Sequence, residues 1–250
     1  MRQRKTVCDL LTTVVTTFVV TLAICCVSRA QTQLVWQGRT WKITNGGMAG
    51  VARGNPSNVS VDSKGYLHLS ITKAGETWTA AELFTVDNVG FGTYQWVVDG
   101  NVWDMDPVTV LGLFPYGPTH GIGKDATNEI DIEFSKWGNT CVCNADFTVY
   151  PPVAREQDKP SYELNFKVDE GTTTLTTARM VWSSTNIVFT LMSGDQPIGT
   201  TANVLKTATY KSSTTDIPQQ PIPVGINLWA FKAVPATKQS VVIRSFEYVP

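Results

Sequence analysis

Short runs of alternating apolar and polar residues follow one another along most of the chain. In one of them, Leu67, Leu69 and Ile71 are separated by polar residues. A period of two is that of a β-strand with one buried face. Turn residues such as Asp99-Gly100 end several of these runs, and no stretch has a convincing helical period. The pattern therefore predicts an all-β protein with roughly a dozen strands.

The predicted strands share this alternation or are short apolar runs between turn signals. They cover residues 39–44, 58–61, 66–72, 78–86, 91–99, 107–114, 129–134, 145–150, 161–168, 173–182, 186–192, 224–231 and 240–249. Residues 115–128, rich in Gly, Pro and Asp, and the polar residues 201–220 are expected to be loops. Many strands with short turns favour two stacked antiparallel sheets, and 250 residues suffice for one such domain.

The run EIDIE at 129–133 carries a carboxylate at every second position. In a strand, Glu129, Asp131 and Glu133 lie in one row on one face, while Ile130 and Ile132 point to the other. Such a row is costly because like charges repel. It suits glycosidic-bond cleavage, which needs two carboxyl groups, one as general acid and one as nucleophile or base. The alternative is a half-exposed strand with an acidic solvent face.

Strand geometry gives the separation of the two glutamates. Four residues at about 3.3 Å rise place the Cα atoms of Glu129 and Glu133 about 13 Å apart. If both side chains lean inward over Asp131, their carboxyl carbons come within about 5–6 Å. Retaining glycosidases require about 5–5.5 Å and inverting ones about 6.5–9.5 Å. The spacing therefore favours a retaining enzyme, with Asp131 placed to hydrogen-bond the nucleophile and help keep Glu133 protonated.

Two later residues could bind sugar from a single strand. Asn227 and Trp229 share one face, with Ile226 and Leu228 on the other. An amide beside an indole ring offers a hydrogen bond and a stacking surface to a sugar. Most of the eight Trp residues are expected to be ordinary core residues.

Other polar side chains lie on strand faces near the acidic run. Asp146, Thr148 and Tyr150 share a face of the strand that follows it, and Glu82 alternates with apolar neighbours on an earlier strand. Each is a candidate for substrate binding. A solvated strand face explains any one of them equally well.

The first thirty residues differ from the rest. Arg2, Arg4 and Lys5 precede an apolar run over 10–27, and Ser28-Arg29-Ala30 provides small residues at a cleavage site. This predicts a secretory signal peptide over 1–30, followed by a single catalytic domain over 31–250. The protein is then secreted, periplasmic or held in the cell envelope. The alternative is an uncleaved membrane anchor, since the run approaches spanning length.

Charge and cysteine content exclude several kinds of site. Without residues 1–30, which hold four basic residues and one acidic residue, 16 basic and 20 acidic residues remain, for a net charge of −4. No basic patch indicates nucleic acid. His68 and His120 are the only histidines, which disfavours a Ser–His–Asp triad and a zinc site. Cys141 and Cys143 could form a disulfide or remain a free pair.

The motif and its surroundings resemble glycoside hydrolase family 16, in particular its lichenase-like and laminarinase-like members. The resemblance is carried by EIDIE at 129–133, AEL at 81–83, GFGTY at 90–94, FPYGP at 114–118 and INLW at 226–229. It extends over about residues 36–250, nearly all of the chain after the predicted signal peptide.

This resemblance implies a concanavalin-like β-jelly-roll sandwich with a concave substrate cleft and a double-displacement mechanism. Glu129 would be the nucleophile, Glu133 the acid/base and Asp131 the assisting residue. Four further residues would line the sugar subsites: Glu82, Tyr150, Asn227 and Trp229.

The sequence departs from the family pattern in places. Ala126, Thr127 and Asn128 stand where lichenases carry a Trp before the first motif Glu. This departure weakens the case for mixed-linkage glucan as substrate. The extra residue that laminarinases carry before the second Glu is absent. Ser245 stands at a position where some members place a calcium-binding Asp, and Asp146 where relatives often carry an amide. No cofactor or bound metal is therefore expected.

Together these features predict an exported, monomeric, retaining endo-β-glycosidase that acts on a polysaccharide, with a β-glucan as the expected substrate. A transglycosylase on the same fold is a close variant. A non-catalytic, lectin-like carbohydrate-binding protein is the alternative from another class. A cell-envelope structural protein is a third possibility if residues 10–27 are an anchor. No nucleic-acid partner is expected, and membrane association only if the N-terminal segment stays uncleaved.

Overall fold

β-Strands make up most of the structure. The computed structural model describes residues 32–117, 126–169, 171 and 173–250. The predicted signal peptide and part of the loop predicted over 115–128 lie outside these residues. Across the part of the chain that is described, no helix is both long and apolar enough to cross a membrane.

The strands follow the period-two pattern of the sequence, with one face buried and the other more exposed. Their bounds are β1 (Gln33–Trp36), β2 (Arg39–Ile43), β3 (Arg53–Gly54), β4 (Val59–Val61), β5 (Leu67–Ala74), β6 (Thr77–Thr85), β7 (Gly92–Asp99), β8 (Thr109–Pro115), β9 (Glu129–Ser135), β10 (Ala145–Tyr150), β11 (Tyr162–Phe166), β12 (Leu175–Trp182), β13 (Asn186–Ser193), β14 (Val204–Lys211), β15 (Val224–Ala230) and β16 (Gln239–Val249). Short 3-10 helices include η1 (Pro56–Asn58), η2 (Val102–Asp104), η4 (Trp137–Asn139) and η5 (Glu156–Asp158).

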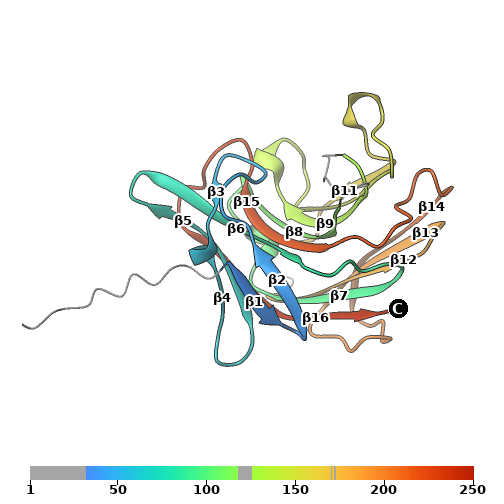
Figure 1. Cartoon of the computed structure of the whole chain (residues 1–250), viewed down its shortest axis with the longest axis horizontal. Coiled ribbons are helices and arrows are strands. Elements are labelled where there is room, and N and C mark those ends of the chain that lie inside the picture. The colour runs from blue at the N-terminus through green and yellow to red at the C-terminus, as the bar shows by residue number, and fades with distance from the viewer. Residues whose placement is uncertain (1–31, 118–125, 170, 172) are drawn as a thin grey trace, which may run out of the picture.

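The strands form two stacked layers (Figure 1). Their hydrogen-bonded order is β11-β10-β9-β8-β15-β6-β5-β16-β7-β12-β13-β14. The path doubles back between β6 and β5, so that β11 to β6 form one layer and β5 to β14 the other. Pairing is antiparallel except for the short β3, which runs parallel to β6. The predicted all-β jelly-roll sandwich is confirmed, with the addition that the β5–β6 hairpin joins its two sheets.

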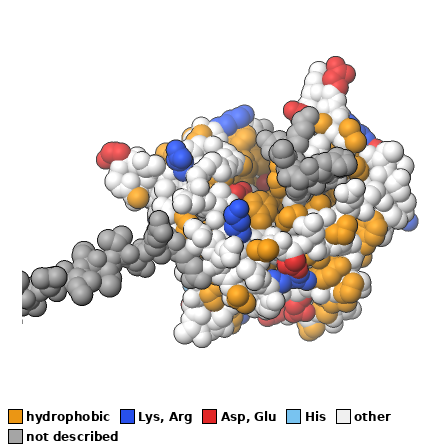
Figure 2. Space-filling model, viewed as in Figure 1, with side chains coloured by type: hydrophobic (Ala, Val, Ile, Leu, Met, Phe, Trp, Pro, Cys, Tyr) orange, Lys and Arg blue, Asp and Glu red, His pale blue; other side chains and the backbone are white. Residues whose placement is uncertain are grey.

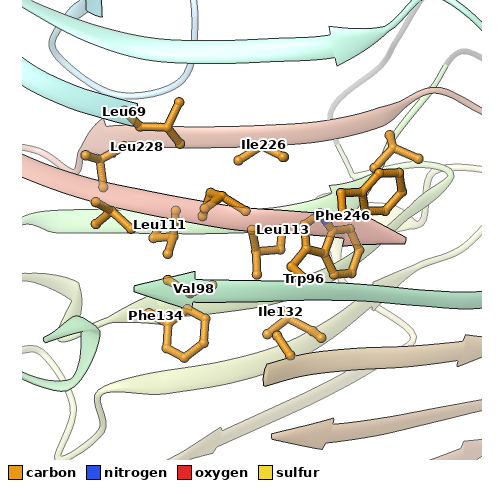
Figure 3. Packing of buried hydrophobic residues seen from close by; sticks show 14 of the residues in the cluster. Leu69, Trp96, Val98, Leu111, Leu113, Ile132, Phe134, Ile226, Leu228 and Phe246 are labelled. Carbon is orange, nitrogen blue, oxygen red and sulfur yellow. The ribbon is translucent and has the colours of Figure 1, made fainter. Parts of the chain in front are cut away.

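The core fills the space between the layers (Figure 3). Leu111, Ile132 and Ile226 from one layer face Trp96 and Phe246 from the other, and all five are buried. Burying each such side chain contributes about 1.5–3 kcal/mol. Most Trp residues are indeed core residues: Trp36, Trp41, Trp96, Trp103 and Trp182 are buried.

One expected loop contains a strand. Residues 201–220 were expected to form a polar surface loop, but β14 occupies 204–211 and pairs with β13. Its exposed Lys and Thr residues make its composition look like that of a loop. Leu205, Ala208 and Tyr210 pack partly buried against the core. β14 ends the hydrogen-bonded order and is an edge strand, so a weak apolar face is sufficient to hold it.

Candidate active site

The acidic run at 129–133 forms β9 with its charged and apolar residues on opposite faces. Ile130 and Ile132 are fully buried in the core. On the other face, Glu129 and Glu133 are half-buried and Asp131 is 4% exposed. The predicted separation of faces is confirmed. The alternative of a solvated acidic face does not fit, because the central carboxylate is almost completely removed from water.

Neighbouring strands extend the acidic row sideways. On β10, Tyr150 lies opposite Glu129, and Asp146 lies opposite Glu133. On β8, Gly112 lies opposite Glu133 and also opposite Asn227 of β15. These pairings bring residues from distant parts of the sequence together on one face of one sheet.

Gly112 leaves room for a side chain on the floor of the site. Its N–H donates a hydrogen bond to Asn227 Oδ1 at 3.0 Å. A Cβ atom at position 112 would come within 2.5 Å of the same oxygen. The amide of Asn227 can therefore lie over β8 toward Glu133 only because residue 112 has no side chain.

Glu82 continues the row on β6, directly opposite Asn227. Its Oε2 accepts a hydrogen bond from Thr44 Oγ1 at 2.6 Å. Burial raises the pKa of Glu82, while its interactions with Thr44 and Asn227 lower it. The carboxyl group is thus fixed in place at the edge of the acidic row.

These residues line a cleft with a volume of about 620 Å³, which is within the usual range of about 300–1,000 Å³ for ligand sites. Hydrophobic and acidic side chains are visible together in this hollow (Figure 2). The cleft is lined by Met48, Ala49, Glu82, Phe84, Phe114, Tyr116, Ala126, Glu129, Asp131, Glu133, Trp137, Tyr150, Asp158, Asn227 and Trp229. All seven predicted site residues are among them, although their roles stay predictions.

The carboxyl groups of β9 differ in their preference for a proton. Burial, followed by the negative charges of Glu129, Glu133 and Asp146, raises the pKa of Asp131 well above its ordinary value. A hydrogen bond between Asp131 and Glu129 acts in the same direction. That effect is expected if protonated Asp131 donates to ionised Glu129. Asp131 therefore stabilises the negative charge on Glu129.

Glu133 also favours the protonated form. Burial is the main cause of its raised pKa, and the charges of Asp146 and Glu129 add to it. Asp146 is buried too, and its pKa is raised to about 7, although hydrogen bonds from Trp137 and Thr148 oppose the shift. Burial and the nearby acids likewise raise the pKa of Tyr150. Asp131 and Glu133 thus both favour the protonated form, and Asp131 is hydrogen-bonded to Glu129.

Aromatic rings form two clusters in the cleft lining. Trp137 and Trp229 meet edge to face with centroids 6.0 Å apart, and Phe231 packs against both. In the other cluster, Phe84 and Phe114 are 5.7 Å apart and Tyr116 contacts both.

Sequence reasoning missed most of these rings. Of the aromatic residues in the cleft, only Trp229 and Tyr150 were predicted. Phe114 lies two residues beyond Gly112 on the same strand, so alternation along β8 would have placed both on the cleft face. The apolar character of that strand suggested burial on both sides instead. Trp137 follows β9 in an irregular segment, where no period gives a signal.

The loop between β9 and β10 is closed by a disulfide bond between Cys141 and Cys143, with Cα atoms 5.3 Å apart. This resolves the two alternatives that the sequence left open. Within the described ranges, no group of three or more His, Cys, Asp or Glu residues is arranged to hold a metal ion.

Solved structures with the same fold include several β-glucanases. A Bacillus licheniformis β-glucanase matches with a TM-score of 0.60 and 22% identity, over 84% of this chain and 92% of that one. A prokaryotic β-1,3-1,4-glucanase (lichenase) from a mouse hindgut metagenome has a TM-score of 0.63 and 22% identity, over 86% and 95%. An immunostimulatory antigen and pseudo β-1,3-glucanase of Mycobacterium tuberculosis has a TM-score of 0.59 and 18% identity, over 82% and 88%.

Sequence comparison adds nothing to these structural matches. No family model matches the chain, and no curated protein matches it. The chain therefore shares the fold of these β-glucanase structures, and its activity depends on the residues of the site.

Proposed function

We propose that the protein is a retaining, endo-acting glycoside hydrolase that cleaves a β-glucan. The observation that carries this proposal is a row of three carboxyl groups in a cleft, in which the pKa values of Asp131 and Glu133 are raised by burial and neighbouring charge and Asp131 is hydrogen-bonded to Glu129. In the proposed mechanism, protonated Asp131 stabilises Glu129 as an anion and Glu133 keeps its proton. A nucleophile and a general acid on one strand are the two groups that glycoside hydrolysis requires.

The two glutamates act in sequence. Ionised Glu129 attacks the anomeric carbon while Glu133 donates its proton to the departing glycosidic oxygen, which forms a glycosyl-enzyme. Glu133, now ionised, takes a proton from water as that water attacks the same carbon, and Glu129 leaves as a carboxylate. The strand-derived carboxyl separation of about 5–6 Å supports this retaining course.

The lining of the cleft favours a neutral polysaccharide. Its charged members are Glu82, Glu129, Asp131, Glu133 and Asp158, with neither Lys nor Arg among the lining residues that the structure describes. Such a surface repels sulfated or carboxylated chains. The aromatic rings offer apolar faces to sugar rings. Because the similar structures include a β-1,3-1,4-glucanase, a β-glucan is the first substrate to test.

The test is incubation of the protein with laminarin, mixed-linkage β-glucan, agarose and κ-carrageenan, followed by chromatography of the products. Internal cleavage of a β-glucan and no release from the sulfated chain are expected. Glu129→Gln should lower kcat by at least about 10³-fold while oligosaccharide affinity is retained, because it removes the nucleophile. Glu76→Gln, in the exposed turn between β5 and β6, is the matched control. Full activity of Glu129→Gln would refute the assignment.

Stereochemistry tests the retaining course separately. In ¹H NMR spectra taken within the first minutes, a retaining enzyme releases the β-anomer of the new reducing end. Initial release of the α-anomer would show an inverting enzyme. An added oligosaccharide acceptor distinguishes hydrolysis from transglycosylation, in which longer products accumulate.

A second candidate is a glucan-binding protein without catalysis. It is favoured by one observation: a similar structure is described as a pseudo β-1,3-glucanase. In that case the wild-type protein would bind glucan and release no reducing ends. Export of the protein belongs to the proposal as well and rests on residues 1–30. N-terminal sequencing of secreted protein should begin at or near Gln31.

A further inference from the structure

Asp146 is a buried carboxylate that the mechanism above does not use. It lies on β10 directly opposite Glu133, and only 2% of its surface is exposed. An aspartate that is so completely removed from water is costly unless its charge is compensated. Its contacts show how the charge is held.

Each oxygen of Asp146 has one hydrogen-bond donor. Trp137 Nε1 donates to Oδ2 at 2.9 Å, and Thr148 Oγ1 donates to Oδ1 at 3.1 Å. An indole N–H can only donate, so Oδ2 must accept. Both contacts stabilise the ionised form of Asp146.

Glu133 lacks this support, since no described residue donates a hydrogen bond to its carboxyl group. When two carboxyl groups face each other across a pair of strands, the second ionisation is unfavourable. When the pair holds a single proton, that proton therefore goes to the partner whose anion is less well solvated, and that partner is Glu133. In that state Asp146 carries the negative charge.

We propose that Asp146 is a positioning residue for Glu133: its negative charge, once Asp146 has ionised, keeps the proton on Glu133 and extends the acid function of Glu133 to higher pH. This inference rests on the proposed function, because it gives Glu133 the acid role. It assigns to Asp146 an effect on the pH range of the enzyme and no contact with substrate.

The other groups around Glu133 do not replace this effect. On its own strand, the charge of Glu129 raises the pKa of Glu133 in the same direction but by less than that of Asp146, and Asp131 favours its own protonated form. The hydroxyl of Tyr150 stays neutral, since its pKa is raised. The residue opposite Glu133 on β8 is Gly112, which carries no charge.

Further from Glu133, the described lining of the cleft adds acids and neither Lys nor Arg, and Lys232 lies over the ring of Phe231, which packs against Trp137. Glu82 and Asp158 line the cleft, and Glu163 lies one strand beyond Asp146. Lys136 follows Glu133 by three positions but is paired with Asp104 at 2.8 Å. Among the neighbouring charges that raise the pKa of Glu133, that of Asp146 comes first.

Asp146→Asn tests the inference because the substitution removes the charge and keeps the shape. The amide oxygen can accept from Trp137 and its NH₂ can donate to Thr148, so both hydrogen bonds survive. The alkaline limb of the kcat/KM profile reports the acid of the free enzyme. We expect this limb to move to lower pH by about one to two units, the size of one unit charge at about 5 Å in a partly screened site.

Glu163→Gln is the matched control. Glu163 is an exposed carboxylate on β11, opposite Thr148, and lies outside the cleft lining. Its charge is the smallest of the causes that shift the pKa of Asp146. Because water screens an exposed charge, its removal should move the same limb by less than about 0.3 unit. A limb that stays in place in Asp146→Asn, or that moves to higher pH, overturns the inference.

A second measurement does not depend on turnover. ¹³C NMR titration of the side-chain carboxyl groups, with Glu133→Gln identifying the resonance of residue 133, should show the same downward shift in Asp146→Asn. If the shift occurs but the wild-type protein cleaves no polysaccharide, the effect of Asp146 on the pKa of Glu133 is supported and the proposed function is refuted. If the titration of Glu133 is unchanged, the effect of Asp146 is refuted, whether or not the protein is active.

Thr148→Val is the alternative variant if Asp146→Asn does not fold. It removes one donor from Asp146 with little change of shape. The carboxyl group of Asp146 should then titrate about one unit higher, since a hydrogen bond to a charged group has been lost. If its titration is unaffected, the hydrogen bond does not hold the charge and the inference fails.

Discussion

At the scale of single residues, the site depends on the absence of a side chain at Gly112. A methyl group at this position would come within 2.5 Å of Asn227 Oδ1. Gly112→Ala should therefore displace the amide or strain β8, at a cost of about 1–3 kcal/mol in stability. Misplacement of about 1 Å beside a reacting centre can cost up to about 10²-fold, so kcat/KM on β-glucan should fall 10- to 100-fold. Thermal denaturation and steady-state kinetics measure the two effects.

Two further variants make the reason for this loss testable. Gly47→Ala is the control, because its Cβ would meet no atom within 4 Å. In an Asn227→Ala background the added methyl group has no oxygen to displace, so Gly112→Ala should cost less stability there. Equal costs in the two backgrounds would show that Asn227 is not the reason for a glycine.

At the scale of elements, the connection between β9 and β10 links the acid pair to an aromatic wall of the cleft. It carries Trp137, which binds Asp146, and the Cys141–Cys143 disulfide. A bridge across so short a loop contributes about 1–2 kcal/mol. The double variant Cys141→Ser/Cys143→Ser should therefore lose about 2–8 °C in Tm. Its KM should rise about 2- to 5-fold as Trp137 becomes less fixed, a loss of about 0.5–1 kcal/mol in binding.

The reduced wild-type protein provides the matching comparison. Treatment with dithiothreitol should reproduce the kinetics of the double variant and should not change the variant itself. A wild-type KM that is the same before and after reduction would show that the disulfide does not hold Trp137 in the position that substrate binding needs.

Elements also show where the sequence was sufficient. The bounds predicted for β10, 145–150, agree with the structure, and β9 was recognised with the correct faces, because alternation is strong where one face lies in the core. β14 was missed because an edge strand needs few apolar residues. Trp137 was missed because irregular backbone between strands has no period. The local sequence pattern therefore located the candidate catalytic residues and missed some of the strands and side chains that surround them.

At the scale of the whole molecule, the cleft depends on strand order, which no local pattern contains. Glu82, Asn227 and Glu133 form one row because β6, β15, β8 and β9 are neighbours. Alternation along each strand predicted a face for each of the three residues, and the family resemblance implied a role for each. Neither could show that Gly112 lies between Asn227 and Glu133, or that Asp146 faces Glu133 with two donors of its own. Those relations arise only when the layers are assembled.

The assembled fold places several acids where each is harder to ionise than in the unfolded chain, and this has a consequence for stability. The pKa of Asp146 is raised from 3.8 to about 7. Between these values the folded protein holds a proton that the unfolded chain has released, so the free energy of unfolding falls as pH rises from about 4 to about 7. Above that range both states are ionised and this contribution is constant. The wild-type protein should therefore be more stable at pH 5 than at pH 8.

Asp146→Asn removes this dependence because an amide does not titrate. The variant should match the wild-type protein in Tm at pH 4 and exceed it at pH 8 by about 8–16 °C, since about three pKa units correspond to about 4 kcal/mol. Glu163→Gln, with its exposed carboxylate, should show no such growth with pH. A Tm difference that is the same at both pH values would mean that the substitution acts through packing. A variant that is less stable than the wild-type protein at pH 8 would mean that the charge of Asp146 stabilises the fold. The prediction that burial makes Asp146 harder to ionise would then be wrong.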